Sequence, residues 1–170
     1  MIKRLGERDL KTRYGTFREV LYYDGRRESI AIVMGDVAGG EDVFCRVHSH
    51  CIGAHIFNSV ECTCREEMAA AQAAIESEGR GVVIWLDQEA KGNGHLALIE
   101  SIPYKKEHGQ ARAYEMAGYK ADARSYTEAA QVLKELGVRS IRLLANSEDK
   151  AEELRREGVA VTALQPLDAR

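Results

Sequence analysis

The chain has 170 residues, of which 45% are hydrophobic and 30% are charged, and its formal net charge is -3. These values predict one globular domain over residues 1–170 with an ordinary hydrophobic core, and they do not favour broad electrostatic binding of nucleic acid. No apolar run approaches the length that crosses a bilayer, and no signal-peptide h-region follows Met1. We therefore expect a cytoplasmic protein with no membrane partner.

Strands dominate the first third of the predicted structure. Runs of apolar and aromatic residues separated by glycine-containing turns predict strands over residues 16–23, 29–34 and 43–48. In the third strand, the two-residue alternation places Cys45 on one face and Arg46 and His48 on the other. We expect Cys45 to pack in the core, with the other two side chains facing the cysteine-rich segment that follows.

Helices and strands alternate in the rest of the chain. Apolar residues at helical spacing predict a helix over residues 65–78, and the apolar run at 82–86 predicts a central strand buried on both faces. The later predicted elements are a polar loop at 87–95, a helix at 127–136, a strand at 140–144, a charged helix at 148–157 and a strand at 159–162. This order predicts an α/β or α+β fold, a single domain with a mixed sheet flanked by helices.

Three cysteines give the strongest chemical signal in the chain. Cys51, Cys62 and Cys64 lie close together in the sequence, and in a reducing compartment such a cluster indicates metal ligands rather than disulfides. Zn²⁺ prefers thiolates, and a site with three protein ligands leaves the fourth position open for water. Water bound to zinc ionises near neutral pH and becomes a nucleophile. The sequence therefore predicts one catalytic Zn²⁺ per chain.

The principal alternative is a structural zinc site without catalysis. In that case His48, His50 or His55 would supply a fourth ligand and close the coordination shell. Small zinc modules usually carry a second cysteine knuckle, and this sequence has none. The number of ligands therefore favours an open site.

Three further segments contain charged residues suited to a ligand, and each also has a simpler explanation. The loop at residues 87–94 offers backbone N–H groups and Lys91 to a phosphate, although a solvated turn has the same composition. In an extended segment, the side chains of Asp122 and Arg124 would point the same way. They would then provide a base beside a cation for one site, or simply form a surface ion pair. Lys150 lies near the start of a predicted helix, where a lysine and the helix N-terminus can together bind phosphate. The simpler explanation is a solvated lysine among neighbouring acidic residues.

Together and in this order, these segments resemble the GTP cyclohydrolase II family of riboflavin biosynthesis. The resemblance covers nearly the whole chain, and its most specific part is Arg46-Val47-His48-Ser49-His50-Cys51 followed by Cys62-Thr63-Cys64. The other matching segments are Leu10 to Phe17, Gly35-Asp36, Gly79-Arg80-Gly81, Gln88-Glu89, Asp122-Ala123-Arg124, and Val138 to Leu144 with Asn146.

The resemblance implies a reaction and roles for several residues. The three cysteines would bind Zn²⁺, and its water would attack C8 of a purine, open the imidazole ring and release formate after a second hydrolysis. Asp122 would match the proton acceptor of the family, and Arg124 the arginine that attacks the α-phosphorus and releases pyrophosphate. Tyr104 would be the counterpart of a tyrosine near the ring-opening step.

The resemblance also implies a small-molecule nucleotide substrate, Mg²⁺ accompanying a triphosphate, and a homodimer. Because the chain is short, we expect no dihydroxybutanone-phosphate synthase half. The residues that would bind the nucleotide are Arg46, Val47, His48, Ser49, His50, Glu67, Glu89, Ala90, Lys91 and Lys150.

Several positions depart from the pattern of the family. His50 stands in place of Glu, Glu67 in place of Gln, Lys91 in place of Arg and Ala145 in place of Thr. Such changes alter which hydrogen bonds the site donates and accepts, and therefore which base it selects. One alternative within the class is therefore a diverged relative that opens another base, either a modified purine or a pyrimidine. If the contacts to phosphate are also weakened, the substrate would be a nucleoside or a monophosphate. The His-x-Glu and Pro-Cys-x-x-Cys signature of zinc deaminases is missing.

Overall fold

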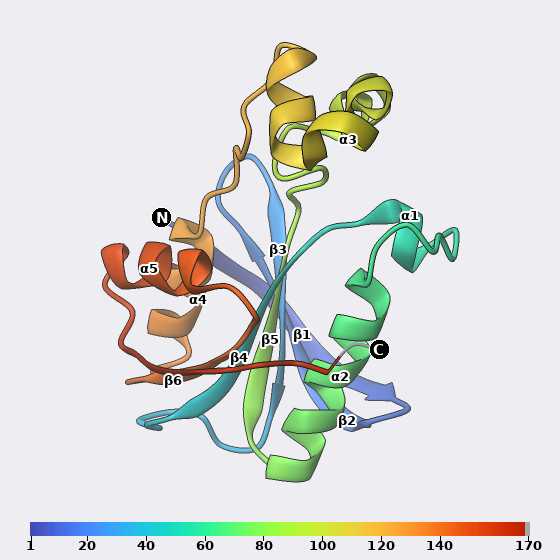
Figure 1. Ribbon diagram of the computed structural model, residues 1–170. Coiled ribbons are helices and arrows are strands. Elements are labelled where there is room, and N and C mark those ends of the chain that lie inside the picture. The colour runs from blue at the N-terminus through green and yellow to red at the C-terminus, as the bar shows by residue number, and fades with distance from the viewer. Residues whose placement is uncertain (169–170) are drawn as a thin grey trace.

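The computed structural model describes residues 1–168, and within them one mixed sheet holds seven strands in the order β1-β2-β3-β5-β4-β6-β7 (Figure 1). The neighbours β1–β2, β2–β3 and β3–β5 pair antiparallel. The neighbours β5–β4, β4–β6 and β6–β7 pair in parallel. Their bounds are β1 Lys3–Thr12, β2 Gly15–Tyr23, β3 Glu28–Met34, β4 Val43–Ser49, β5 Gly81–Leu86, β6 Ile141–Leu144 and β7 Val161–Gln165. The predicted mixed sheet is thus confirmed.

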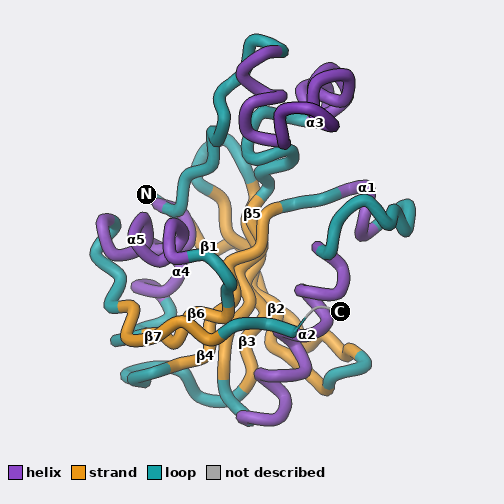
Figure 2. The backbone as a smooth tube through the Cα atoms, viewed as in Figure 1, coloured by secondary structure: helices purple, strands orange, loops and turns teal. Residues whose placement is uncertain are grey.

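Helices cover both faces of this sheet, with α2 on one side and α4 and α5 on the other (Figure 1). The helices among the described residues are α1 Ile52–His55, α2 Cys64–Glu78, α3 His95–Met116, α4 Thr127–Glu135 and α5 Glu148–Arg156. Because β4 and β5 are parallel, the segments that follow them leave the same end of the sheet and lead to α1 and α3 (Figure 2). Polar residues after both strands are therefore gathered at one edge.

The two faces of β4 serve different clusters, as the alternation predicts. Cys45 and Val47 are fully buried in the larger core cluster, which packs against α4 and α5. Phe44 belongs to the cluster under α2, and Arg46 and His48 lie on that same side of the strand. The prediction that Cys45 packs in the core, on the face opposite Arg46 and His48, is confirmed. Of those two side chains, His48 contacts His55 in the cysteine-rich segment, whereas Arg46 pairs with Glu67 of α2.

Several elements differ from the sequence prediction. β1 forms a long edge strand whose side chains are exposed or half-buried, so it lacks the buried alternation by which strands are recognised. α3 occupies a segment with no clear helical stripe and contains Pro103, and the backbone breaks at Gly109, where φ is +74°. The helix projects beyond the end of the sheet, at the top of Figure 1. The last strand also begins later than predicted, at Val161.

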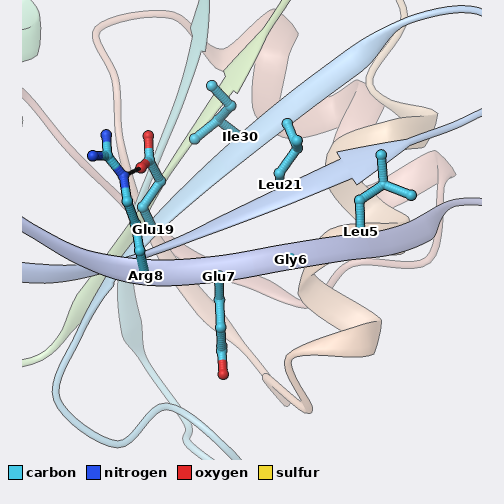
Figure 3. Close-up of a pocket in the computed structure, with 7 residues that line it drawn as sticks. All are labelled: Leu5, Gly6, Glu7, Arg8, Glu19, Leu21 and Ile30. Carbon is cyan, nitrogen blue, oxygen red and sulfur yellow. Dashed lines mark hydrogen bonds and ion pairs between the residues drawn. The ribbon is translucent and has the colours of Figure 1, made fainter.

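A shallow apolar pocket lies on the face of the β1–β3 meander, away from the cysteines. Leu5, Leu21 and Ile30 point to the same side of the strands, next to the ion pair between Arg8 and Glu19 (Figure 3). It shares no lining residue with the cavities described below. Among the described residues, no helix has the length and hydropathy needed to cross a membrane.

Candidate active site

The three predicted metal ligands meet at the end of the sheet where α1 and α2 begin. Cys51 precedes α1, Cys64 opens α2, and Cys62 lies in the loop between them. Their sulfur atoms all lie within 4.8 Å of one another, and the Cys51 and Cys62 sulfurs are 3.6 Å apart. Sulfurs that share a tetrahedral Zn²⁺ at the usual bond length are about 3.8 Å apart. The three thiols are therefore already arranged for one metal ion.

The electrostatics of this cluster also favour a cation. Burial, followed by contact with Cys62, raises the pKa of the Cys51 thiol, and burial and the neighbouring thiols raise the pKa of Cys64 strongly. Three thiolates so close would repel one another, so they ionise together only around a positive charge. A divalent soft metal supplies that charge, and the donor set fits Zn²⁺.

The histidines that could close the shell have other partners. The Nε2 atoms of His48 and His55 are 2.9 Å apart, and burial followed by the charge of Arg46 lowers the pKa of His48 to about 3. His50 lies 3.3 Å from a carboxylate oxygen of Asp87. Within residues 1–168, the only cluster of histidine, cysteine and acidic side chains close enough to hold a metal is the three cysteines. The geometry therefore favours an open coordination position over a fourth protein ligand.

A cavity of about 320 Å³ lies against the cysteines, and we call it the cysteine cavity. Its lining includes Ser49, His50 and Glu89, together with Tyr114 from α3. The hydroxyl oxygen of Ser49 is buried and has no hydrogen-bond partner among the described residues. The remaining lining residues are Cys51, Gly53, Ala54, Ser59, Glu61, Cys62, Cys64, Gln88, Ala90, Lys91, Leu98, Lys105, Gln110 and Arg124.

Tyr114 and Tyr104 both lie on α3, but only Tyr114 lines the cysteine cavity. The Tyr114 side chain is buried, and burial together with the charges of Glu89 and Cys51 raises its pKa to about 12. Its hydroxyl is therefore protonated at neutral pH and can donate a hydrogen bond. Tyr104 is half-buried and lines neither the cysteine cavity nor the charged cavity defined below. Tyr114 was not singled out from the sequence, because only the folding of α3 brings it beside the cysteines.

Glu89 anchors the loop after β5 to the cysteine segment. Its carboxylate accepts a hydrogen bond from the backbone N–H of Ile52 at 3.0 Å and lies 3.3 Å from the ring of His95. Ala90 and Lys91 both have a φ of +53°, a left-handed conformation that is uncommon outside glycine. Such strain gathers at functional sites, where the surrounding structure enforces it.

The same loop packs closely on the segment that contains Asp122 and Arg124. A side chain at Gly92 would meet the carbonyl of Ala123 at 2.7 Å, so glycine is required for this approach. The backbone N–H of Ala123 donates to the carbonyl of Lys91 at 2.8 Å. The buried side chain of Gln88 both donates to and accepts from the backbone of Ser125, at 2.7 Å each. These contacts fix the position of Arg124.

Asp122 and Arg124 form a forked ion pair. The Arg124 Nε lies 3.0 and 3.1 Å from the two carboxylate oxygens, and the Arg124 backbone N–H also donates to Asp122. Burial opposes ionisation of Asp122, but the hydrogen bonds from Arg124 outweigh it and hold the pKa of the carboxyl below its usual value. The segment is a loop rather than a strand, yet the two side chains do face the same way.

A second cavity, of about 360 Å³, adjoins the first across Arg124, and we call it the charged cavity. Within it, buried Arg46 pairs with Glu67 and donates to the carbonyl of Leu144 at 3.0 Å. Lys150 donates to the carbonyl of Val47 at 2.9 Å, while the Val47 side chain faces the core. The other lining residues are Asp122, Tyr126, Ala145, Asn146, Ser147, Asp149 and Glu153.

A sulfur cluster beside a cavity, with an ionised carboxylate nearby, is an arrangement that suits a metal-dependent hydrolase. The sequence model of GTP cyclohydrolase II matches residues 3–166. The chain is 34% identical over 170 residues to the GTP cyclohydrolase-2 of Actinobacillus succinogenes, covering 98% of this chain and 78% of that protein. The chain therefore belongs to the GTP cyclohydrolase II family, and the resemblance seen in the sequence is confirmed.

Other similar proteins are longer. The riboflavin biosynthesis protein RibBA of Bacillus mycoides is 38% identical over 170 residues, which cover 98% of this chain and 43% of that protein. The chain thus spans less than half the length of that relative. A crystal structure of RibBX, a two domain 3,4-dihydroxy-2-butanone 4-phosphate synthase from A. baumannii, superposes with a TM-score of 0.52 at 17% identity, covering 99% of this chain and 40% of that one. That similarity concerns the fold.

Proposed function

We propose that the protein is a zinc-dependent hydrolase that opens the imidazole ring of a purine nucleotide, GTP or a related purine, and releases formate. The observation that carries this proposal is the cluster of three thiols beside a cavity, in a chain of the GTP cyclohydrolase II family. Hydrolysis of one C–N bond at C8 opens the ring, and hydrolysis of the second C–N bond frees C8 as formate. Each step consumes one water molecule.

Cys51, Cys62 and Cys64 would hold one Zn²⁺ per chain, which when bound supplies a Lewis acid that makes water nucleophilic near neutral pH. Asp122 is the proposed proton acceptor, because the ion pair with Arg124 keeps its carboxyl ionised at neutral pH. Arg124 lines both cavities, which supports a role in orienting the substrate between them.

The proposed substrate contacts fall into two groups. Ser49, His50, Glu89, Ala90 and Lys91 line the cysteine cavity, whereas Arg46, Glu67 and Lys150 line the charged cavity. His48 and Val47 act indirectly, since the first contacts His55 and the second holds Lys150 through its carbonyl.

The wider setting is also part of the proposal. A triphosphate substrate would bring Mg²⁺ and lose pyrophosphate, and the protein would work in the cytoplasm, in riboflavin biosynthesis or a related pathway. Residues 1–170 would form a single GTP cyclohydrolase II-like domain. Exposed apolar side chains on α3 and in the loop after α1 support a homodimer; they are Ile56, Phe57, Val60, Leu96, Ile99, Ile102 and Met116.

Product analysis tests the reaction class. We expect zinc-loaded protein incubated with purine nucleosides and nucleotides to release formate without ammonia, since ring opening at C8 leaves the exocyclic amine in place. Formate and ammonia are measured enzymatically in the same samples, with heat-denatured protein as the control. Ammonia without formate would indicate deamination, and neither product from any purine would favour a structural zinc module.

A matched pair of tyrosine variants tests which residue of α3 serves the reaction. We propose that Tyr114 takes the role that the resemblance assigns to Tyr104, because Tyr114 lines the cysteine cavity with a protonated hydroxyl. Tyr114→Phe is expected to lower kcat by about 10²-fold to 10³-fold, as loss of one hydrogen-bond donor to the transition state does. Tyr104→Phe is expected to stay within about twofold of the parent protein. The reverse order in formate release would return the role to Tyr104.

A further inference from the structure

The backbone holds His50 at the end of the sheet where β4 and β5 lie side by side. Ser49 pairs with Leu86 at the end of the parallel ladder, and the backbone N–H of His50 donates to the carbonyl of Leu86 at 2.9 Å. The His50 ring also packs edge-on against the ring of Trp85, with the two centroids 5.2 Å apart. Because these contacts come from sheet strands, the His50 side chain lines the cysteine cavity from a fixed position.

Asp87 determines which ring nitrogen of His50 carries the proton. The Nδ1 atom of His50 lies 3.3 Å from a carboxylate oxygen of Asp87, whereas the neighbouring carboxylate oxygen of Glu89 is 4.0 Å away, beyond hydrogen-bond distance. A carboxylate only accepts, so Nδ1 is the donor in the contact with Asp87. In the neutral ring, the other nitrogen, Nε2, therefore keeps its lone pair and is an acceptor. Asp87 itself does not line the cysteine cavity.

The Nε2 atom of His50 is open to a ligand. Among residues 1–168 it has no hydrogen-bond partner, and it is not one of the buried unpaired atoms, which belong to Arg46, His48, Ser49 and Tyr126. The His50 side chain is 24% exposed and lines the cysteine cavity. An accessible acceptor thus stands beside the place proposed for the base. Such an atom matches an N–H group of the base, which a 6-oxopurine offers at N1.

We propose that Asp87 is a positioning residue that sets base specificity, because it holds the Nδ1–H of His50 and leaves Nε2 to accept a hydrogen bond from N1–H of a 6-oxopurine. The inference rests on the proposed function, since it takes a purine base to lie in the cysteine cavity. Adenine has an acceptor at N1 and would leave both lone pairs unsatisfied. An imidazole held in this way also accepts a hydrogen bond as a carboxylate does, which gives a reason why His50 can stand in place of Glu.

Nitrogen NMR of isotope-labelled histidine tests the tautomer without any turnover. In zinc-loaded protein we expect a protonated Nδ1 and an unprotonated Nε2 for His50, with the resonances assigned by their loss in His50→Gln. Asp87→Ala should release the proton from Nδ1 and populate the Nε2–H form. Adding 7-deaza-GTP, whose five-membered ring lacks the N–C–N unit that is hydrolysed, should shift the Nε2 resonance. A proton on Nε2 in the parent protein, or no shift on nucleotide binding, would overturn the proposal.

Calorimetric binding of two unreactive nucleotides tests the selectivity. We expect the parent protein to bind 7-deaza-GTP more tightly than 7-deaza-ATP. Asp87→Ala should reduce the ratio of the two affinities by about tenfold, the effect of losing one hydrogen bond. Adding His50→Glu to Asp87→Ala should restore the ratio, because a carboxylate accepts without a second group to orient it. Tighter binding of 7-deaza-ATP by the parent protein, or no rescue by His50→Glu, would contradict the proposed role.

Glu107→Ala is the matched control, since it also removes a carboxylate beside a histidine. Glu107 lies 3.7 Å from His108 on α3, and neither residue lines the cysteine cavity. This variant should keep the affinity ratio within about twofold of the parent value. If Asp87→Ala instead weakened both nucleotides equally, or neither, Asp87 would have no part in specificity. Because neither measurement needs hydrolysis, a protein that binds as expected but releases no formate from GTP would reject the hydrolase and leave the role of Asp87 standing.

Discussion

Replacing Cys62 with serine is expected to remove bound zinc and abolish formate release. The Cys62 sulfur lies 3.6 Å from that of Cys51 and belongs to the only three-ligand cluster found among residues 1–168. A hydroxyl is a poor zinc ligand at neutral pH, and two thiolates hold the metal far more weakly than three. Zinc content measured by elemental analysis should fall from about one per chain to well below that, in parallel with formate release.

Cys45→Ser provides the matched control for this variant. Cys45 carries the same thiol but is fully buried on the opposite face of β4, in the core cluster under α4 and α5. Its replacement should lower the melting temperature, because a hydroxyl enters an apolar core, while zinc content and formate release per folded protein stay near parental levels. A Cys62→Ser protein with a full zinc complement and undiminished turnover would remove the metal from the proposed mechanism.

The strands that face the core could be predicted from the sequence, whereas the edge of the sheet could not. Helices cover both faces of the sheet at β4 and β5, so these strands are rich in apolar residues and can be recognised from composition. β1 pairs only with β2, and its side chains are exposed or half-buried. Burial imposes no pattern on such a strand, and its charged residues are those that keep an edge from pairing with another chain.

α3 could not be predicted for a related reason. The helix lies beyond the end of the sheet, so few of its side chains are buried, and its apolar residues do not form one stripe. Pro103 and Gly109 are also signals that end helices. The consequence for the site was large, because Tyr114, Lys105 and Gln110 reach the cysteine cavity from this helix.

The metal ligands were apparent from the sequence because all of them come from one short segment. The rest of the site depends on pairs that are distant in sequence, such as Arg46 with Glu67, and Lys150 with the carbonyl of Val47. The sequence points to each of these residues, but their contacts with one another are visible only in the fold.

Asp122→Asn is expected to lower the rate of ring opening by about 10²-fold or more, the usual contribution of a positioned base. The hydrogen bonds from Arg124 hold the pKa of Asp122 below its usual value, so the parent carboxyl is ionised at neutral pH and can accept a proton. The amide of asparagine keeps one oxygen for the backbone N–H of Arg124 but accepts no proton, so kcat should fall while KM changes little. Kinetics of formate release at saturating substrate would measure this, with zinc content confirming an intact metal site.

Glu152→Gln is the matched control for Asp122→Asn, since it also removes one negative charge but lies exposed on α5, paired with Arg156. It should retain the parental kcat within about twofold, as exposed ion pairs contribute little. A second variant, Arg124→Gln, separates the two roles open to Asp122. If the carboxylate serves only to hold the guanidinium, both variants should lose the same factor and the double variant should lose no more. If Asp122 accepts the proton, Asp122→Asn should be the more damaging change, and a near-parental rate in that variant would make the ion pair a structural one.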